Sequence, residues 1–96
     1  MKPSIPYETD LLERLKNPRR AVGYLNACME HGDDGDFLVA LRDVAQVHGG
    51  IRKLAKKAGL SREHMFKMLS KEGNPRLHSL RQLMDVMGFK LVLKAA

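Results

Sequence analysis

The sequence predicts an all-α fold of five to six helices that ends in one short strand. Apolar residues recur at helical spacing along most of the chain, capping residues separate these stretches, and apolar and polar residues alternate only in the tail. The 96 residues, 44% apolar and 29% charged, are typical of a single globular domain. We divide the predicted domain into an N-terminal helical extension (1–33), a core (34–88) and a C-terminal strand (89–94).

Three helices are predicted before the glycine pair at 49–50. The first ends at Asn17, because Pro18 disfavours helical geometry in the residue before it. Asn17 can then cap a second helix that has Pro18 at its first position and closes at Gly32. Asp33 or Asp34 offers the cap of a third. The predicted core stripe of the second helix is Ala21, Val22, Leu25, Cys28 and Met29.

The stretch IRKLAKKAGLSREHMFKMLS, which begins at Ile51, has the pattern of a helix-turn-helix. A small residue, Ala55, stands where the second helix crosses close to the first, and Gly59 can supply a left-handed turn. Leu60 and Met65 fill the angle between the two helices, and Met68 anchors the second one to the body. An ordinary helical hairpin is the alternative.

The second helix of such a motif lies in the major groove of DNA with its N-terminal residues toward the bases. Arg62 could bind guanine, Glu63 could accept from cytosine, and Phe66 could touch a thymine methyl. The alternative for Phe66 is that its ring folds back into the core. The predicted readers on this helix are Arg62, Glu63, His64, Phe66 and Lys67. The other predicted DNA-binding residues, most of them suited to phosphate, are Arg52, Lys53, Ser61, Lys71, Asn74 and Arg76.

The net positive charge of the chain arises in its second half. Residues 1–50 hold six Lys or Arg against eight Asp or Glu, which gives −2, whereas residues 51–96 hold eleven against three, which gives +8. A polyanionic partner rewards this segregation through phosphate neutralisation and counterion release. The charge distribution therefore favours nucleic acid as a partner, although basic faces are also common on proteins that do not bind it.

A glycine, an asparagine and a proline at 73–75 break the chain before a sixth helix, whose apolar stripe runs from Leu77 to Met87. The strand predicted after it cannot satisfy its backbone groups alone. We expect the same segment of a second subunit to pair with it across a twofold axis. A partner protein's sheet edge and a frayed end are the alternatives. The predicted dimer interface is Phe89, Leu91, Val92 and Leu93.

Several other function classes are disfavoured. The single cysteine, Cys28, cannot form an intramolecular disulfide, and it lies in a helical apolar pattern that suits a buried residue. The four histidines have no metal-ligand spacing, so we predict neither an enzyme nor a metal or other cofactor. The first ten residues lack the apolar core of a signal peptide, and no run reaches membrane-spanning length. We therefore predict a cytoplasmic protein.

The run GLSREHMFKMLSKEGNPRLHSL, followed by LMDVMGFKL, resembles the addiction-module antidote proteins. These HigA-like antitoxins form a branch of the lambda-repressor-like helix-turn-helix superfamily. The upstream segment from Tyr7 to Ala45 is also similar, so the resemblance covers nearly the entire chain. It implies a lambda-repressor-like helix-turn-helix domain. One departure is visible: many relatives in the superfamily place Gln at the start of the first helix of the motif, where this chain has Ile51 and then Arg52.

The resemblance also implies the function. Such an antitoxin binds the operator of its own two-gene operon as a dimer, represses it, and neutralises a small RelE/HigB-like ribonuclease toxin by direct contact. The DNA-reading role is carried over onto Ser61, Arg62, Glu63, Phe66 and Lys67. Two alternatives remain: a prophage-type repressor without a toxin, and a protein-binding helical module that does not bind DNA. No motif marks the toxin contacts, and the helices before Gly50, which carry mixed charge, are the candidates for them.

Overall fold

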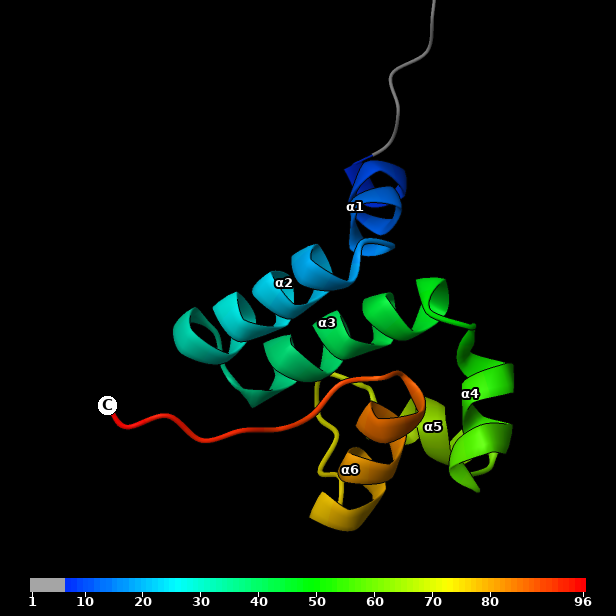
Figure 1. Ribbon diagram of the computed structural model, residues 1–96. Coiled ribbons are helices and arrows are strands. Elements are labelled where there is room, and N and C mark those ends of the chain that lie inside the picture. The colour runs from blue at the N-terminus through cyan, green and yellow to red at the C-terminus, as the bar shows by residue number, and fades with distance from the viewer. Residues whose placement is uncertain (1–6) are drawn as a thin grey trace, which may run out of the picture.

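The computed structural model of the chain describes the backbone of residues 7–96 and the side chains of residues 10–96; residues 1–6 of the predicted extension lie outside this range. The helices are α1 (Tyr7–Leu15), α2 (Pro18–His31), α3 (Asp34–Val47), α4 (Ile51–Ala58), α5 (Arg62–Met68) and α6 (Leu77–Val86). α2 and α3 lie side by side in opposite directions, and α1, α2 and α4 all pack against α3 (Figure 1). The predicted all-helical class is confirmed.

Short-range capping sets the starts of α2 and α3. The Asn17 side chain accepts hydrogen bonds from the backbone N–H groups of Arg19 and Arg20 at 2.9 and 3.3 Å, so it satisfies donors that have no partner within the helix. At α3, Asp33 accepts from the backbone of Asp36 at 2.8 Å, and Asp36 accepts from the backbone of Asp33 at 3.0 Å. This reciprocal pair is a capping box, and it identifies Asp33 as the cap.

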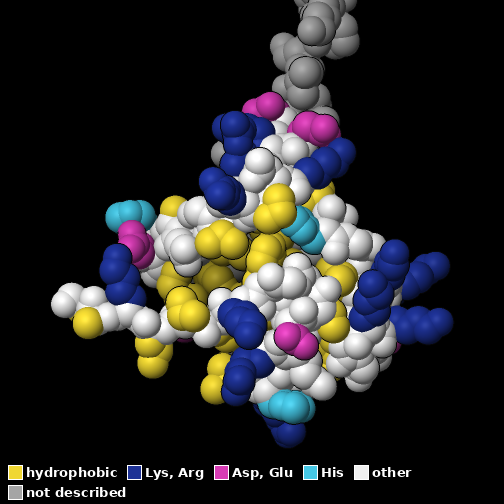
Figure 2. Space-filling model, viewed as in Figure 1, with side chains coloured by type: hydrophobic (Ala, Val, Ile, Leu, Met, Phe, Trp, Pro, Cys, Tyr) yellow, Lys and Arg dark blue, Asp and Glu magenta, His cyan; other side chains and the backbone are white. Residues whose placement is uncertain are grey.

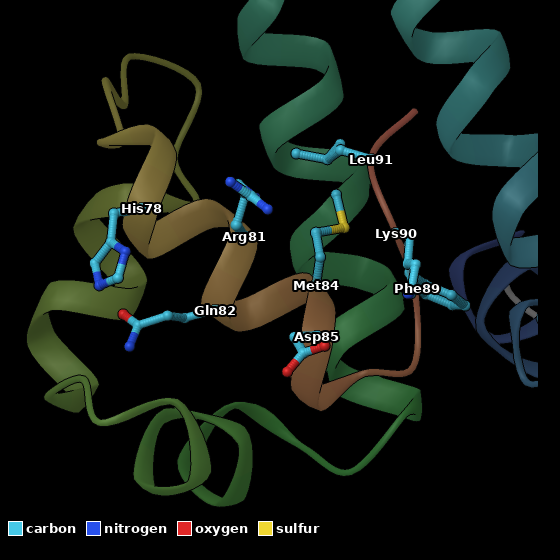
Figure 3. A pocket seen from close by; sticks show the side chains of 8 residues that line it. All are labelled: His78, Arg81, Gln82, Met84, Asp85, Phe89, Lys90 and Leu91. Carbon is cyan, nitrogen blue, oxygen red and sulfur yellow. The ribbon is translucent and has the colours of Figure 1, made fainter. Parts of the chain in front are cut away.

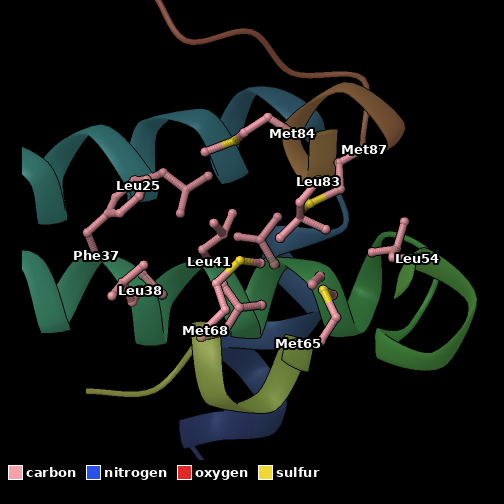
Figure 4. Close-up of a cluster of buried hydrophobic side chains, with 14 of the residues drawn as sticks. Leu25, Phe37, Leu38, Leu41, Leu54, Met65, Met68, Leu83, Met84 and Met87 are labelled. Atoms are coloured by element: carbon pink, nitrogen blue, oxygen red, sulfur yellow. The ribbon is translucent and has the colours of Figure 1, made fainter. Parts of the chain in front are cut away.

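One cluster of buried apolar side chains joins all six helices. Leu41 and Val44 lie fully inside it, because α3 is packed on several sides. Figure 4 shows side chains from both halves of the chain converging on this helix. Methionines fill the space between α3 and the C-terminal helices, as the sequence predicted, since their flexible side chains adapt to irregular gaps. The buried methionines are Met65, Met68, Met84 and Met87.

The predicted core stripe of α2 is partly wrong. Ala21 and Leu25 are buried and Cys28 is half-buried, but Val22 is 40% exposed and Met29 is 53% exposed. The buried positions recur every three or four residues and so share one face of the helix, whereas Val22 and Met29 each follow that face by one residue, about 100° around the axis. The contact with α3 is narrower than the apolar stripe.

The C-terminal strand that the sequence predicted is absent from the described residues. The chain turns at Gly88, where φ is +83°, and the Phe89 N–H donates to the Met84 carbonyl oxygen at 2.8 Å. Phe89 packs against the core, whereas residues 90–96 run without regular structure along the molecule (Figure 1). A strand requires a neighbouring strand for its hydrogen bonds, and a single copy of the described chain offers none.

Candidate nucleic-acid interface

The tight turn predicted between two short helices is present. α4 ends at Ala58, and Gly59 adopts the left-handed conformation, with φ +71° and ψ +29°. The Gly59 N–H donates to the Lys56 carbonyl oxygen at 3.2 Å, and the Leu60 N–H donates to the Ala55 carbonyl oxygen at 2.8 Å. These two hydrogen bonds close the helix in a Schellman motif. Only a residue without a Cβ adopts this conformation without strain. The turn thus fixes the direction in which α5 leaves α4.

Capping and apolar contacts hold α5 in place. The Ser61 hydroxyl accepts from the His64 N–H at 3.0 Å, as expected of the predicted cap. Met65 is completely buried, Met68 and Ala55 nearly so, and Leu60 packs against the same core. α5 also packs directly against α4. One side of α5 is therefore committed to the core, as the sequence predicted.

The opposite side of α5 faces solvent. All five predicted readers are exposed: Arg62, Glu63, His64, Phe66 and Lys67. Among them, Arg62 lies over the ring of Phe66, with its guanidinium carbon 5.5 Å from the ring centre. A cation over an aromatic face is attracted by the negative potential of the ring. Arg62 and Phe66 therefore form one exposed unit on this helix.

Phe66 does not fold back into the core, which was the alternative for its ring. The side chain is 41% exposed and forms one edge of a shallow hollow beneath the N-terminal helices. The hollow is lined by Leu11, Leu12, Tyr24, Val39, Arg42, Asp43, Gln46 and Phe66. The ring thus borders both the outward face of α5 and the surface made by α1, α2 and α3.

α4, which packs against α5, carries an exposed basic face of its own. Leu54, Ala55 and Ala58 are buried, which leaves four cations on the opposite side. Figure 2 shows Lys and Arg side chains gathered at the edge of the molecule over α4. The exposed cations are Arg52, Lys53, Lys56 and Lys57. The sequence prediction included the first two and missed Lys56 and Lys57, although the same buried spacing indicates them.

The predicted DNA-binding residues after α5 have different surroundings. Asn74 and Arg76 are exposed, and Arg76 precedes the first turn of α6. The Lys71 ammonium nitrogen instead lies 2.6 Å from Asp36 Oδ1 and 3.8 Å from Asp33 Oδ1. The hydrogen bond from Lys71, together with one from the Asp33 backbone, lowers the pKa of Asp36, and the pKa of Lys71 is raised by the same hydrogen bond and by the nearby charges of both carboxylates.

The predicted dimer residues lie in and beyond a hollow between α6 and the tail. Figure 3 shows Met84 and Arg81 of α6 beside Leu91 of the tail. Phe89 is half-buried, and its ring packs at a tilt of 59° against His48, the residue that follows α3, with 5.5 Å between the two ring centres. Leu91 is 42% exposed, and Val92 and Leu93 are almost fully exposed. Phe89 therefore anchors the tail to its own chain, and the following apolar residues are uncovered.

The described residues hold no group of three His, Cys, Asp or Glu side chains that could bind a metal ion. Cys28 is half-buried, and its burial, followed by the charges of Asp36 and Asp43, raises the pKa of its thiol. Within the described range, every helix is too short or too polar to cross a membrane.

Comparison with known proteins identifies the family. Residues 7–95 match the family model described as probable addiction module antidote protein. An uncharacterized protein of Haemophilus influenzae is 30% identical over 81 residues, which cover 84% of this chain and 82% of that relative. No solved structure matches the chain. Since the family model spans almost all of the sequence, the resemblance to addiction-module antidote proteins is confirmed, and the chain belongs to the family of probable addiction module antidote proteins.

Proposed function

We propose that this chain is the antitoxin of a type II toxin-antitoxin module and that it represses its own operon by sequence-specific binding to operator DNA. In this proposal the core is a lambda-repressor-like domain in which α4 and α5 form the helix-turn-helix. The protein acts in the cytoplasm as a dimer, has no catalytic activity, and neutralises a small RelE/HigB-like ribonuclease. Membership of the antidote family supports the antitoxin role.

One observation carries the DNA-binding part: the geometry of the α4–α5 turn. Gly59 in the left-handed conformation directs α5 so that its buried methionines face the core and its polar residues face outward. An exposed helix of this kind, next to a second helix with a basic outer face, has the form of a major-groove reader. The +8 charge of residues 51–96 complements phosphate.

We assign the contacts by their chemistry. On α5, Arg62 reads guanine, Glu63 accepts from cytosine, and Phe66 touches a thymine methyl. Ser61 and the cations of α4 contact phosphates and set the register of the protein on the duplex. The proposed phosphate-contacting cations are Arg52, Lys53, Lys56 and Lys57, all of which are exposed.

We place the dimer contact at the tail. Val92 and Leu93 are exposed apolar residues in an extended segment, and antiparallel pairing with the same segment of a second copy would cover them and satisfy the backbone. A symmetric dimer presents two copies of α5, so the operator is expected to contain two half-sites in a palindrome.

A binding titration tests the DNA part. The full chain is titrated with a duplex from the region upstream of its own gene and with a scrambled duplex, at two salt concentrations. We expect tighter binding to the upstream duplex and a steep fall in affinity as salt rises. Equal binding to both duplexes would contradict sequence-specific repression, and no binding to either would favour a protein-binding module.

A separate experiment tests the toxin part. The gene beside this one is expressed alone and together with this chain, and growth and complex formation are measured. We expect growth arrest that the chain relieves, and co-elution of the two proteins. If the neighbouring product is harmless or does not bind, while DNA binding holds, the chain is an autonomous repressor.

A further inference from the structure

The segment that follows α5 is tied to the first turn of α3. Residues 69–76 lead from α5 to α6, and within them the Lys71 side chain reaches back to α3. Its ammonium donates to Asp36 Oδ1 at 2.6 Å and lies 3.8 Å from Asp33 Oδ1. These two carboxylates are far from Lys71 in sequence, so the interaction joins two separate parts of the fold.

The two carboxylates that bind Lys71 are already held in place, because they cap α3. Asp33 and Asp36 form the capping box of α3, in which each carboxylate accepts a backbone N–H of the other residue. Asp36 uses Oδ2 for that bond and Oδ1 for Lys71, so both of its oxygens are engaged. A carboxylate held in this way loses little further freedom when it binds a cation, which favours the contact.

The backbone makes the same connection. Gly35, in the first turn of α3, is buried, and a Cβ at this position would collide with the carbonyl oxygen of Lys71. A Cβ on Gly73 would likewise collide with the carbonyl oxygen of Met68, the last residue of α5. The segment therefore lies directly on α3 at one point and folds back on the end of α5 at the other.

We infer that Lys71 is a positioning residue: its ammonium, held by the capping-box carboxylates, fastens the C-terminal end of α5 to α3 and fixes the angle at which α5 meets DNA. The inference rests on the proposed function and refines it. It replaces the phosphate contact that the sequence suggested for Lys71, because an ammonium shared by two carboxylates releases few counterions when it approaches DNA.

Binding measurements distinguish the two roles. Lys71→Gln and the control Lys53→Gln are each titrated with the upstream duplex and the scrambled duplex over a range of salt. For Lys53→Gln we expect weaker binding to both duplexes. The slope of the logarithm of the binding constant against the logarithm of the salt concentration should also be less steep by about 0.9. For Lys71→Gln we expect an unchanged slope and a several-fold smaller preference for the upstream duplex. A slope reduced by about 0.9 on both duplexes in Lys71→Gln would overturn the inference.

A second measurement does not depend on DNA. Amide hydrogen exchange is followed in the wild type, Lys71→Gln, Asp36→Asn and the double variant. We expect faster exchange of the Leu69 and Gly73 amides in both single variants, and no further increase in the double variant, because the same contact is lost in each. Unchanged exchange in Lys71→Gln would refute the positioning role. If the wild type binds no duplex, the proposed DNA binding is wrong, and exchange alone decides whether Lys71 holds this segment.

Discussion

The guanidinium of Arg62 lies over the ring of Phe66, with 5.5 Å between its central carbon and the ring centre. The two residues are one turn apart on α5, and both are exposed. The contact orients a side chain that otherwise has many rotamers, so Arg62 loses less conformational freedom when it binds. We therefore expect the two side chains to contact DNA together.

Arg62→Ala is predicted to lose about 1 to 3 kcal/mol of discrimination between the upstream and scrambled duplexes, because it removes the proposed bidentate contact to guanine. Competition titrations measure this difference. Lys57→Ala is the matched control, since it removes an exposed cation from α4 and is expected to weaken both duplexes alike. Unchanged discrimination in Arg62→Ala would show that α5 does not read the major groove through this residue.

The turn between α4 and α5 is predicted to depend on the backbone of Gly59. Gly59→Ala forces a side chain into the left-handed region and should lower the free energy of unfolding by about 1 to 2 kcal/mol. In Gly23→Ala, in the interior of α2, the added Cβ meets no atom within 4 Å. This substitution should raise the free energy of unfolding by about 0.5 to 1 kcal/mol. Urea unfolding of both variants tests the contrast. Equal effects at the two positions would contradict it.

The parts of this fold that were predictable from the sequence are those with local causes. Asn17, Gly59 and Ser61 act on backbone groups within four residues, so a cap or turn residue carries its own information. The exposure of Val22 was not predictable in this way, because it depends on how wide the contact between α2 and α3 is. The pairing of Lys71 with Asp36 spans 35 residues, and charge pattern alone does not reveal it.

The candidate site shows the same division. Burial of Met65 and Met68 follows from helical spacing, and it places Arg62 and Lys67 outward. The position of Phe66 at the edge of a hollow required the N-terminal helices to be in place. The predicted strand is missing for a related reason: a strand needs a neighbouring strand for its hydrogen bonds, and one copy of the described chain offers none.

Cys28 is predicted to react slowly with alkylating reagents in the folded protein. Burial and two nearby carboxylates raise the pKa of its thiol, so less thiolate is present at a given pH than in the unfolded chain. The rate with iodoacetamide should increase with pH over a range displaced upward from that of the urea-unfolded protein. Coincident pH profiles for the folded and unfolded protein would contradict the assigned surroundings of Cys28.

The tail provides the test of the proposed dimer. Val92 is 84% exposed, so substitution there should leave the fold of the single chain unchanged. Val92→Pro removes a backbone N–H and disfavours pairing within a strand, whereas Val92→Ala keeps that donor. We expect the wild type and Val92→Ala to sediment as dimers and Val92→Pro as a monomer. We also expect Val92→Pro to lose affinity for a duplex with two half-sites but not for one with a single half-site. A Val92→Pro dimer of wild-type stability would locate the interface elsewhere on the chain.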